Sequence, residues 1–348
     1  MGMGVQRWVK RDSIHPQLTD RSVIYSLRQP KSNAFNAPSI RRFERPKKCR
    51  GVRNAPHNPW TIPPVSVEHY ENFPVASLLC PAHLRPAVTA IYWFARTADD
   101  LADEGGAPAE DRLRDLDAFH ADLLAVAQGG MPSPRWSGVF EGLRPVLARF
   151  KLPLNLLTDL LSAFRQDVVK QHYADRAELL DYCRRSANPI GRLLLHLYGM
   201  SARAALQQSD QICTALQLAN FWQDLSVDTR RGRLYVPETD CARHGVRRQG
   251  ARLEPDGPAT RALVTDLVGW ARSLLRSGAP LVHSVSGRAG WELRLVVQGG
   301  LRILEKIEAL DATPLLERPT AAWTDMPLLC WRALSMRSTQ TLPASETR

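Results

Sequence analysis

Apolar residues recur at intervals of three and four along most of the chain from Val65 onward. This spacing places them on one face of an α-helix, whereas the residues of a half-buried strand would alternate. No alternation is long enough to build a sheet. The pattern therefore predicts an all-α protein, with helices at residues 84–102, 113–127, 154–172, 179–198, 212–227, 262–275, 291–310 and 328–336.

Residue types that commonly begin or end helices occur near these predicted helix ends. Gly105-Gly106 and Gly129-Gly130 each precede a proline, and Gly232 follows the fifth predicted helix. Glycine adopts the left-handed conformation that ends many helices, and proline cannot continue one. Asp175 and Glu178 have the spacing of an N-terminal capping box.

Residues 1–64 differ from everything that follows. They are rich in Arg, Ser, Asn and Pro, lack a sustained apolar period and end at Pro63-Pro64. Such a composition buries too little apolar surface to offset the entropy of ordering. We predict a basic, largely disordered extension at residues 1–64, one helical domain at 65–340 and a short tail at 341–348. Core packing is the preferred role for the last helix, and contact with a membrane surface is the alternative.

The net charge of +11 is concentrated in the extension. Residues 1–60 hold 13 basic and 3 acidic side chains, which leaves 33 basic and 32 acidic side chains elsewhere. A nucleic-acid partner is therefore not expected, because it would require a basic folded module. For the extension itself, an arm for nucleic acid or for acidic lipid headgroups is left open, and an extension with no binding role is at least as good an interpretation.

No apolar run approaches the roughly 20 residues that span a bilayer, and the first ten residues lack a secretory core. The prediction is a cytoplasmic protein, with association at a membrane surface left open. The six cysteines show no metal-site spacing and are expected to be reduced and mostly buried.

The segment AIYWFARTADDLADEG, residues 90–105, carries the first acidic stripe. At about 100° per residue, the side chains of Tyr92, Arg96, Asp99 and Asp103 fall within roughly 60° of one another. Asp100 is turned about 100° away from Asp99. A solvated helix face is an equally good interpretation of this segment taken alone.

The segment LQLANFWQDLSVDTRRGRLYVP, residues 216–237, carries the second stripe. Gln217, Asn220, Asp224 and Asp228 span about 80° of a helix that is otherwise apolar or aromatic. Burying these carboxylates is costly unless their charge is compensated. A basic loop with Arg230, Arg231 and Arg233 follows.

Together the stripes indicate a site for divalent cations and a diphosphate. Magnesium binds through one or two carboxylates plus phosphate oxygens, and arginines bind diphosphate directly. Aromatic surroundings would shield and stabilise a carbocation left by the departing diphosphate. A di-iron helical site is the competitor, but it requires Glu-x-x-His motifs that do not accompany these aspartates.

At these motifs the sequence resembles the squalene/phytoene synthase family over about residues 66–310. The family's two DxxxD motifs read here as DDLAD (99–103) and DLSVD (224–228), and GRLYVP (232–237) resembles its GRxYxP. The resemblance implies a single-domain isoprenoid synthase (class I terpenoid synthase) helical bundle with a central cavity. It also implies Mg²⁺ as cofactor, an isoprenoid diphosphate as substrate and, as an open possibility, peripheral membrane contact for the apolar product.

The resemblance also assigns roles by position. The metal positions are Asp99, Asp103, Asn220, Asp224 and Asp228. The catalytic positions are Tyr92, Arg96, Asp167 and Tyr182. The substrate-binding positions are His69, Asn72, Tyr92, Arg96, Gln217, Gln223 and Arg233.

Within the family, residues 69–88 look most like the bacterial hydroxysqualene synthases of the hopanoid pathway, which ionise presqualene diphosphate and let water capture the cation. Gln223 stands where the family usually has an arginine, which fits a pocket for one diphosphate. Asn188-Pro189 replaces a small Ala-Gly step; we interpret it either as holding a water or as a structural kink. The alternatives are a head-to-head prenyl transferase (squalene or phytoene synthase) and, remotely, a non-catalytic assembly factor.

Overall fold

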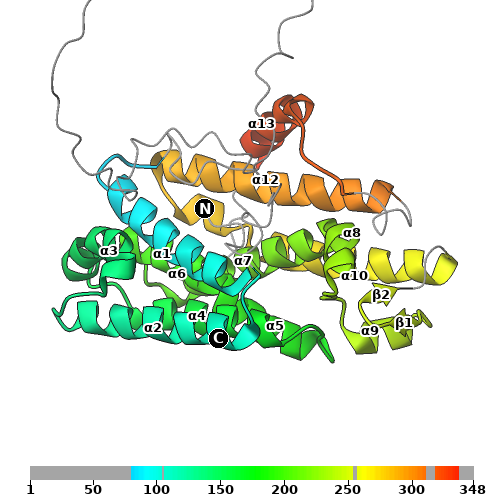
Figure 1. Cartoon of the computed structure of the whole chain (residues 1–348). Coiled ribbons are helices and arrows are strands. Elements are labelled where there is room, and N and C mark those ends of the chain that lie inside the picture. Colours follow the sequence, from blue (N-terminus) through cyan, green and yellow to red (C-terminus); the bar gives the residue numbers. More distant parts are fainter. Residues whose placement is uncertain (1–79, 104–105, 254–256, 311–317, 337–348) are drawn as a thin grey trace, which may run out of the picture. The chain divides into compact units, whose positions relative to one another are not determined.

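The computed structural model describes residues 80–103, 106–253, 257–310 and 318–336 (Figure 1). The helices in these ranges are α1 (Arg85–Asp103), α2 (Ala109–Ala127), α3 (Ser137–Phe150), α4 (Leu154–Val169), α5 (Arg176–Ser186), α6 (Asn188–Leu197), α7 (Arg203–Gln223), α8 (Leu225–Asp228), α9 (Glu238–Arg243), α10 (Pro258–Gly278), α11 (Leu281–Ser284), α12 (Gly287–Ala309) and α13 (Met326–Ser335). Short 3-10 turns are η1 (Pro134–Trp136), η2 (Thr229–Arg231) and η4 (Trp323–Asp325). The all-α prediction is confirmed.

Helix α7 occupies the centre of this arrangement. It packs against α5, α6, α8, α10, α11 and α12. One apolar cluster joins α7 to α5, α10 and α12, and a second joins α1, α2, α3, α4 and α6. Because α7 is in contact with so many helices, its C-terminal end carries the second acidic stripe into the interior rather than onto an outer face.

The structure shows how the helix predicted at residues 179–198 begins and where it is interrupted. The carboxylate of Asp175 caps α5 by accepting a hydrogen bond of 2.9 Å from the Glu178 amide, and Glu178 accepts from the Ala174 amide. The single helix predicted at 179–198 is instead two helices that meet at Ala187. Asn188 is buried there and accepts a hydrogen bond from the Thr214 hydroxyl at 2.9 Å, which supports the structural interpretation of this step.

The periodicity missed several elements. Helix α3 contains Pro145, which removes a backbone donor and obscures its pattern. Helix α9 has only six residues. The hairpin of β1 (Arg248–Gln249) and β2 (Arg252–Leu253) has two residues per strand, too few to show alternation.

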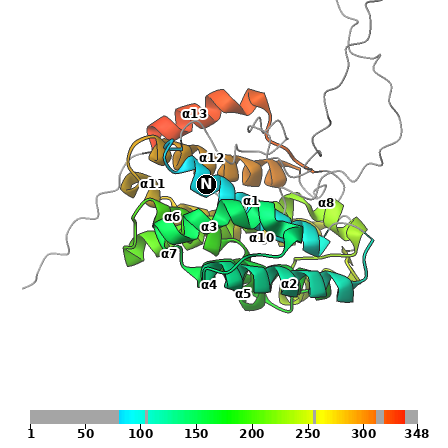
Figure 2. The ribbon, with the colours of Figure 1, turned by 60° about the vertical axis from the view of Figure 1, so that its left-hand side comes forward.

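Helix α13 lies against the outer side of α12 in both views (Figures 1 and 2). Leu329 and Ala333 are buried in this contact, as core packing predicted, while Trp331 and Leu334 are exposed on the opposite face. None of the helices in the described ranges combines the length and apolar character needed to cross a bilayer. Among the cysteines that the structure describes, Cys330 is exposed and the others are buried, namely Cys80, Cys183, Cys213 and Cys241; Cys49 lies outside the described residues.

Candidate active site

The first acidic motif lies on the last turns of α1. Asp99 is only 1% exposed, among the buried apolar residues of that helix, and Asp103 is its final residue. The guanidinium of Arg96 pairs with Asp100 at 3.0 Å. Residues four apart lie on neighbouring turns of a helix, which allows this contact within α1. Tyr92 is half-buried, and its ring meets Trp93 edge-on.

The second motif lies where α7 gives way to α8. Asp224 stands between the two helices with φ −97° and ψ 11°, and Asp228 is the last residue of α8. Both carboxylates are buried, as are Gln217 and Asn220 on the preceding turns of α7. The predicted polar face is therefore buried inside the protein, where the charges require compensation.

Arg233 brings the two motifs together. Its backbone amide donates to the carbonyl of Asp228 at 2.9 Å, so the loop after the second motif holds it in place. Its guanidinium reaches across to Asp103 with contacts of 2.6 Å and 3.3 Å. It also approaches the carbonyl oxygen of Asp167 at 3.5 Å. One residue of the basic loop thus connects the ends of α1, α4 and α8.

The two-pronged contact between Arg233 and Asp103 is the geometry in which a guanidinium binds a carboxylate most strongly. Burial lowers the pKa of Arg233, but nearby acidic groups, including Tyr235, Asp167 and Asp228, outweigh burial and raise it. Arg233 therefore stays protonated in a buried, acidic environment.

A buried tyrosine and aspartate lie next to this arginine. The Tyr182 hydroxyl donates to Asp167 Oδ2 at 2.9 Å, and both side chains are buried. Burial, followed by the charge of Asp167, raises the pKa of Tyr182 well above its usual value. Tyr182 therefore remains a neutral hydrogen-bond donor, and the structure brings together two of the positions named from the resemblance, Tyr182 and Asp167.

Aromatic rings form a cluster around Tyr182. Phe221 and Tyr235 stack with centroids 3.9 Å apart, and Tyr173 stacks on Tyr235 at 5.6 Å. Phe221 lies on α7 between the polar residues of the second motif. The cluster thus packs buried aromatic rings around Tyr182, next to the end of α7 that carries the second motif.

Gln223 has a partner that the sequence did not indicate. The side chain is 1% exposed, and its amide donates to the carbonyl of Pro319 at 2.6 Å. Arg318, the preceding residue, forms an ion pair with Asp224. His69 and Asn72 lie outside the described residues.

Sequence reasoning missed Arg318, Tyr173 and Tyr235. Tyr235 lies inside the GRLYVP segment, so the motif itself was a signal that could have identified it. Arg318 has no motif around it, and it is separated from Asp224 by 94 residues. Only the packing of the C-terminal segment brings it to the site.

The donor set fits a divalent cation that binds together with a phosphorylated substrate. In the described part of the chain, no three His, Cys, Asp or Glu side chains form a ready-made metal-binding group. Mg²⁺ does not require one, since it commonly takes one or two carboxylates and completes its shell with phosphate oxygens and water. The buried aspartates of the two motifs supply oxygen ligands of this kind.

Comparisons with known proteins agree with this geometry. The family model for squalene/phytoene synthase matches residues 67–326. Hydroxysqualene synthases of Rhodopseudomonas palustris and Zymomonas mobilis are 36% and 39% identical; each match covers 71% of this chain and 82% of the relative.

Among solved structures, a squalene synthase of Alicyclobacillus acidocaldarius has a TM-score of 0.64 and 36% identity. That match covers 70% of this chain and 90% of the other. With a matching family model over most of its length and curated relatives above 30% identity, this chain belongs to the squalene/phytoene synthase family.

Proposed function

We propose that this chain is a hydroxysqualene synthase that converts presqualene diphosphate and water into hydroxysqualene and diphosphate. The C–O bond to the diphosphate breaks, and its electron pair leaves with the diphosphate. The cation rearranges, water adds to it, and a proton is lost. The observation that carries the proposal is 36–39% identity to three proteins named hydroxysqualene synthase, over 82% of their lengths.

The geometry supports roles for this chain's own residues. Arg233 and Arg318, which lie against Asp103 and Asp224, would bind the departing diphosphate. The stacked rings of Phe221 and Tyr235 would face the cation and exclude bulk water. Tyr182, held neutral by burial and by its bond to Asp167, would position a hydroxyl beside this surface.

We propose Mg²⁺ as the cofactor, with Asp99, Asp103, Asp224 and Asp228 as ligands and Asn220 beside them. The buried carboxylates of both motifs support this assignment. When bound, the cation would neutralise charge on the departing diphosphate.

The test is incubation of the pure protein with presqualene diphosphate and Mg²⁺ in ¹⁸O-labelled water, followed by product identification. We expect a labelled C30 alcohol without NADPH, and no alcohol from an Asp99→Asn control. The second candidate is a head-to-head prenyl transferase, favoured by 30% identity to the presqualene diphosphate synthase of Rhodopseudomonas palustris over 69% of its length. Efficient condensation of farnesyl diphosphate would select this candidate.

We also propose that the apolar product leaves toward a bilayer surface at the outer face of α13. The exposed side chains of Trp323, Trp331 and Leu334 support this, because tryptophan and leucine are residues that insert at membrane interfaces. Flotation with lipid vesicles tests it. Binding that falls in a Trp331→Ser/Leu334→Ser variant is expected, and equal binding by both proteins would contradict the proposal.

A further inference from the structure

The backbone just before η4 lies against the second acidic motif. Pro319 accepts a hydrogen bond of 2.6 Å from the buried amide of Gln223, and Arg318 pairs with Asp224. Gln223 therefore binds protein backbone at this point of the site. The guanidinium that meets Asp224 comes instead from Arg318, in a segment from another part of the chain.

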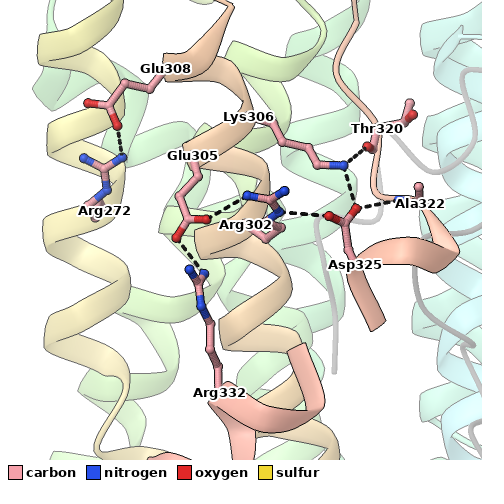
Figure 3. Close-up of polar contacts among 9 residues, drawn as sticks. All are labelled: Arg272, Arg302, Glu305, Lys306, Glu308, Thr320, Ala322, Asp325 and Arg332. Carbon is pink, nitrogen blue, oxygen red and sulfur yellow. Dashed lines mark hydrogen bonds and ion pairs between the residues drawn. The ribbon is translucent and has the colours of Figure 1, made fainter. Parts of the chain in front are cut away.

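The same segment is held from its other side by a network of charged groups (Figure 3). Lys306 on α12 donates to the Thr320 carbonyl at 2.8 Å and pairs with Asp325 at 2.5 Å. Asp325 also accepts from the Ala322 amide at 2.8 Å and pairs with Arg302 at 2.9 Å.

Asp325 is buried, with only 5% of its surface exposed, yet it remains charged. Burial raises the pKa of this carboxyl, but the Ala322 amide, Lys306 and Arg302 outweigh burial and lower it well below the usual range. The network continues to α13, because Glu305 lies between Arg302 and Arg332 at 3.1 Å and 2.6 Å.

We infer that Asp325 and Lys306 are positioning residues that hold Arg318 at the diphosphate site by fixing the backbone of residues 318–322. Gln223 fixes the same backbone at the end nearer the motif. Few residues separate the Gln223 contact from the contacts of Lys306 and Asp325, and each extended residue spans at most about 3.6 Å. The backbone between these contacts therefore has little freedom to move while both are present. Release at Asp325 would let Arg318 move away from Asp224. This inference rests on the proposed function, because it takes the substrate's diphosphate as the ligand of Arg318.

A purely structural role for the network predicts a different outcome. If Asp325 only attached α13, its loss would lower the melting temperature and leave affinity for diphosphate unchanged. The matched control is Arg272, whose guanidinium pairs with Glu308 on α12 at 2.6 Å (Figure 3). This pair is also an ion pair between an arginine and a carboxylate and also involves α12, but it joins α12 to α10.

The experiment compares Asp325→Asn, Lys306→Met and Arg272→Gln with the wild type. Calorimetry measures the affinity for inorganic diphosphate with Mg²⁺, and steady-state kinetics with presqualene diphosphate separates KM from kcat. Hydrogen exchange follows the Ala322 amide. We expect Asp325→Asn and Lys306→Met to weaken diphosphate binding and raise KM about tenfold, the size of one lost charge-assisted bond. Exchange at Ala322 should accelerate, and Arg272→Gln should stay within about twofold of the wild type.

A double-mutant cycle tests whether Asp325 acts through Arg318. In an Arg318→Gln background, Asp325→Asn should cause no further loss of diphosphate affinity. Additive losses, or an Asp325→Asn protein that binds diphosphate as well as Arg272→Gln does, would overturn the inference. Lys306→Met provides the same comparison if Asp325→Asn does not fold. A wild type that neither binds diphosphate nor turns over substrate would instead refute the proposed function.

Discussion

The two acidic motifs share one spacing but differ in backbone and in partners. Asp99 and Asp103 lie on one continuous helix, whereas Asp224 stands at the break between α7 and α8. Asp103 is paired with Arg233 from the loop that follows the other motif. Asp224 is paired with Arg318 from the C-terminal segment. The first motif is therefore paired with an arginine from the loop that follows the second motif. The second motif is paired with an arginine from a segment far away in the sequence.

The largest effect should come from neutralising the carboxylates. We expect each of Asp99→Asn, Asp103→Asn, Asp224→Asn and Asp228→Asn to reduce turnover at least about a hundredfold, because each removes charge needed at the departing diphosphate. Circular dichroism should show the helical fold intact. Full activity of a double variant in either motif, or in excess EDTA, would contradict the proposed metal site.

Substitution of Arg233 and of Arg318 compares how strongly each motif is stabilised by its arginine. Arg233→Gln leaves the buried Asp103 carboxylate without its two-pronged partner, so we expect a loss of about 3 kcal/mol in the free energy of unfolding. Arg318→Gln should cost somewhat less, about 2 kcal/mol, because it also leaves a buried carboxylate, that of Asp224, without this arginine, while its segment keeps the bonds to Gln223 and Lys306. Denaturant unfolding measures both. Equal losses would show that the two motifs are supported alike.

The first motif was easier to predict than the second for a physical reason. On the unbroken helix α1, Asp99 and Asp103 keep the spacing of the predicted polar stripe, and the structure shows that Asp99 is buried. Spacing could not decide whether Arg96 would pair with Asp99 or Asp100, because neighbouring turns offer both. The break at Asp224 and the arrival of Arg318 depend on tertiary packing across 94 residues, which a local pattern does not record.

The same limit applies to the fold. Long apolar helices such as α10 and α12 follow from periodicity alone. The separation of α5 from α6 depends on a proline at the start of α6 and on the bond between Asn188 and Thr214. The central cavity, the domain boundaries and the individual catalytic roles stay predictions.

Acid should affect the C-terminal segment through its carboxylates. Asp325 has a pKa lowered from 3.8, so its contribution to stability is present above that value and is lost as the pH falls toward the folded-state pKa. Glu305, whose pKa is also lowered, acts in the same direction. We expect amide exchange in α13 to accelerate as the pH falls below about 4. An exchange rate in α13 that stays unchanged across this range would contradict the prediction.

Raising the pH should instead affect the buried region around Tyr182. Tyr182 has a pKa raised above 10.0, so the unfolded chain loses its proton first as the pH rises. The contribution of Tyr182 is therefore complete below pH 10 and declines above it. Tyr182→Phe should reduce this decline, measured as the dependence of the free energy of unfolding on pH. An unchanged pH dependence would show that Tyr182 does not titrate in the unfolding transition.

The smallest effect should follow deletion of residues 1–60. Every partner named for the two motifs lies at residue 96 or beyond, and the deleted stretch has a composition that does not form a core. Melting temperature and turnover should therefore remain nearly unchanged. The stretch does carry 13 basic and 3 acidic side chains, so any loss should appear in binding to anionic vesicles and should shrink as salt is raised. Neutral vesicles are the control. A large fall in melting temperature would instead mean that this stretch packs on the helical domain and supports the site.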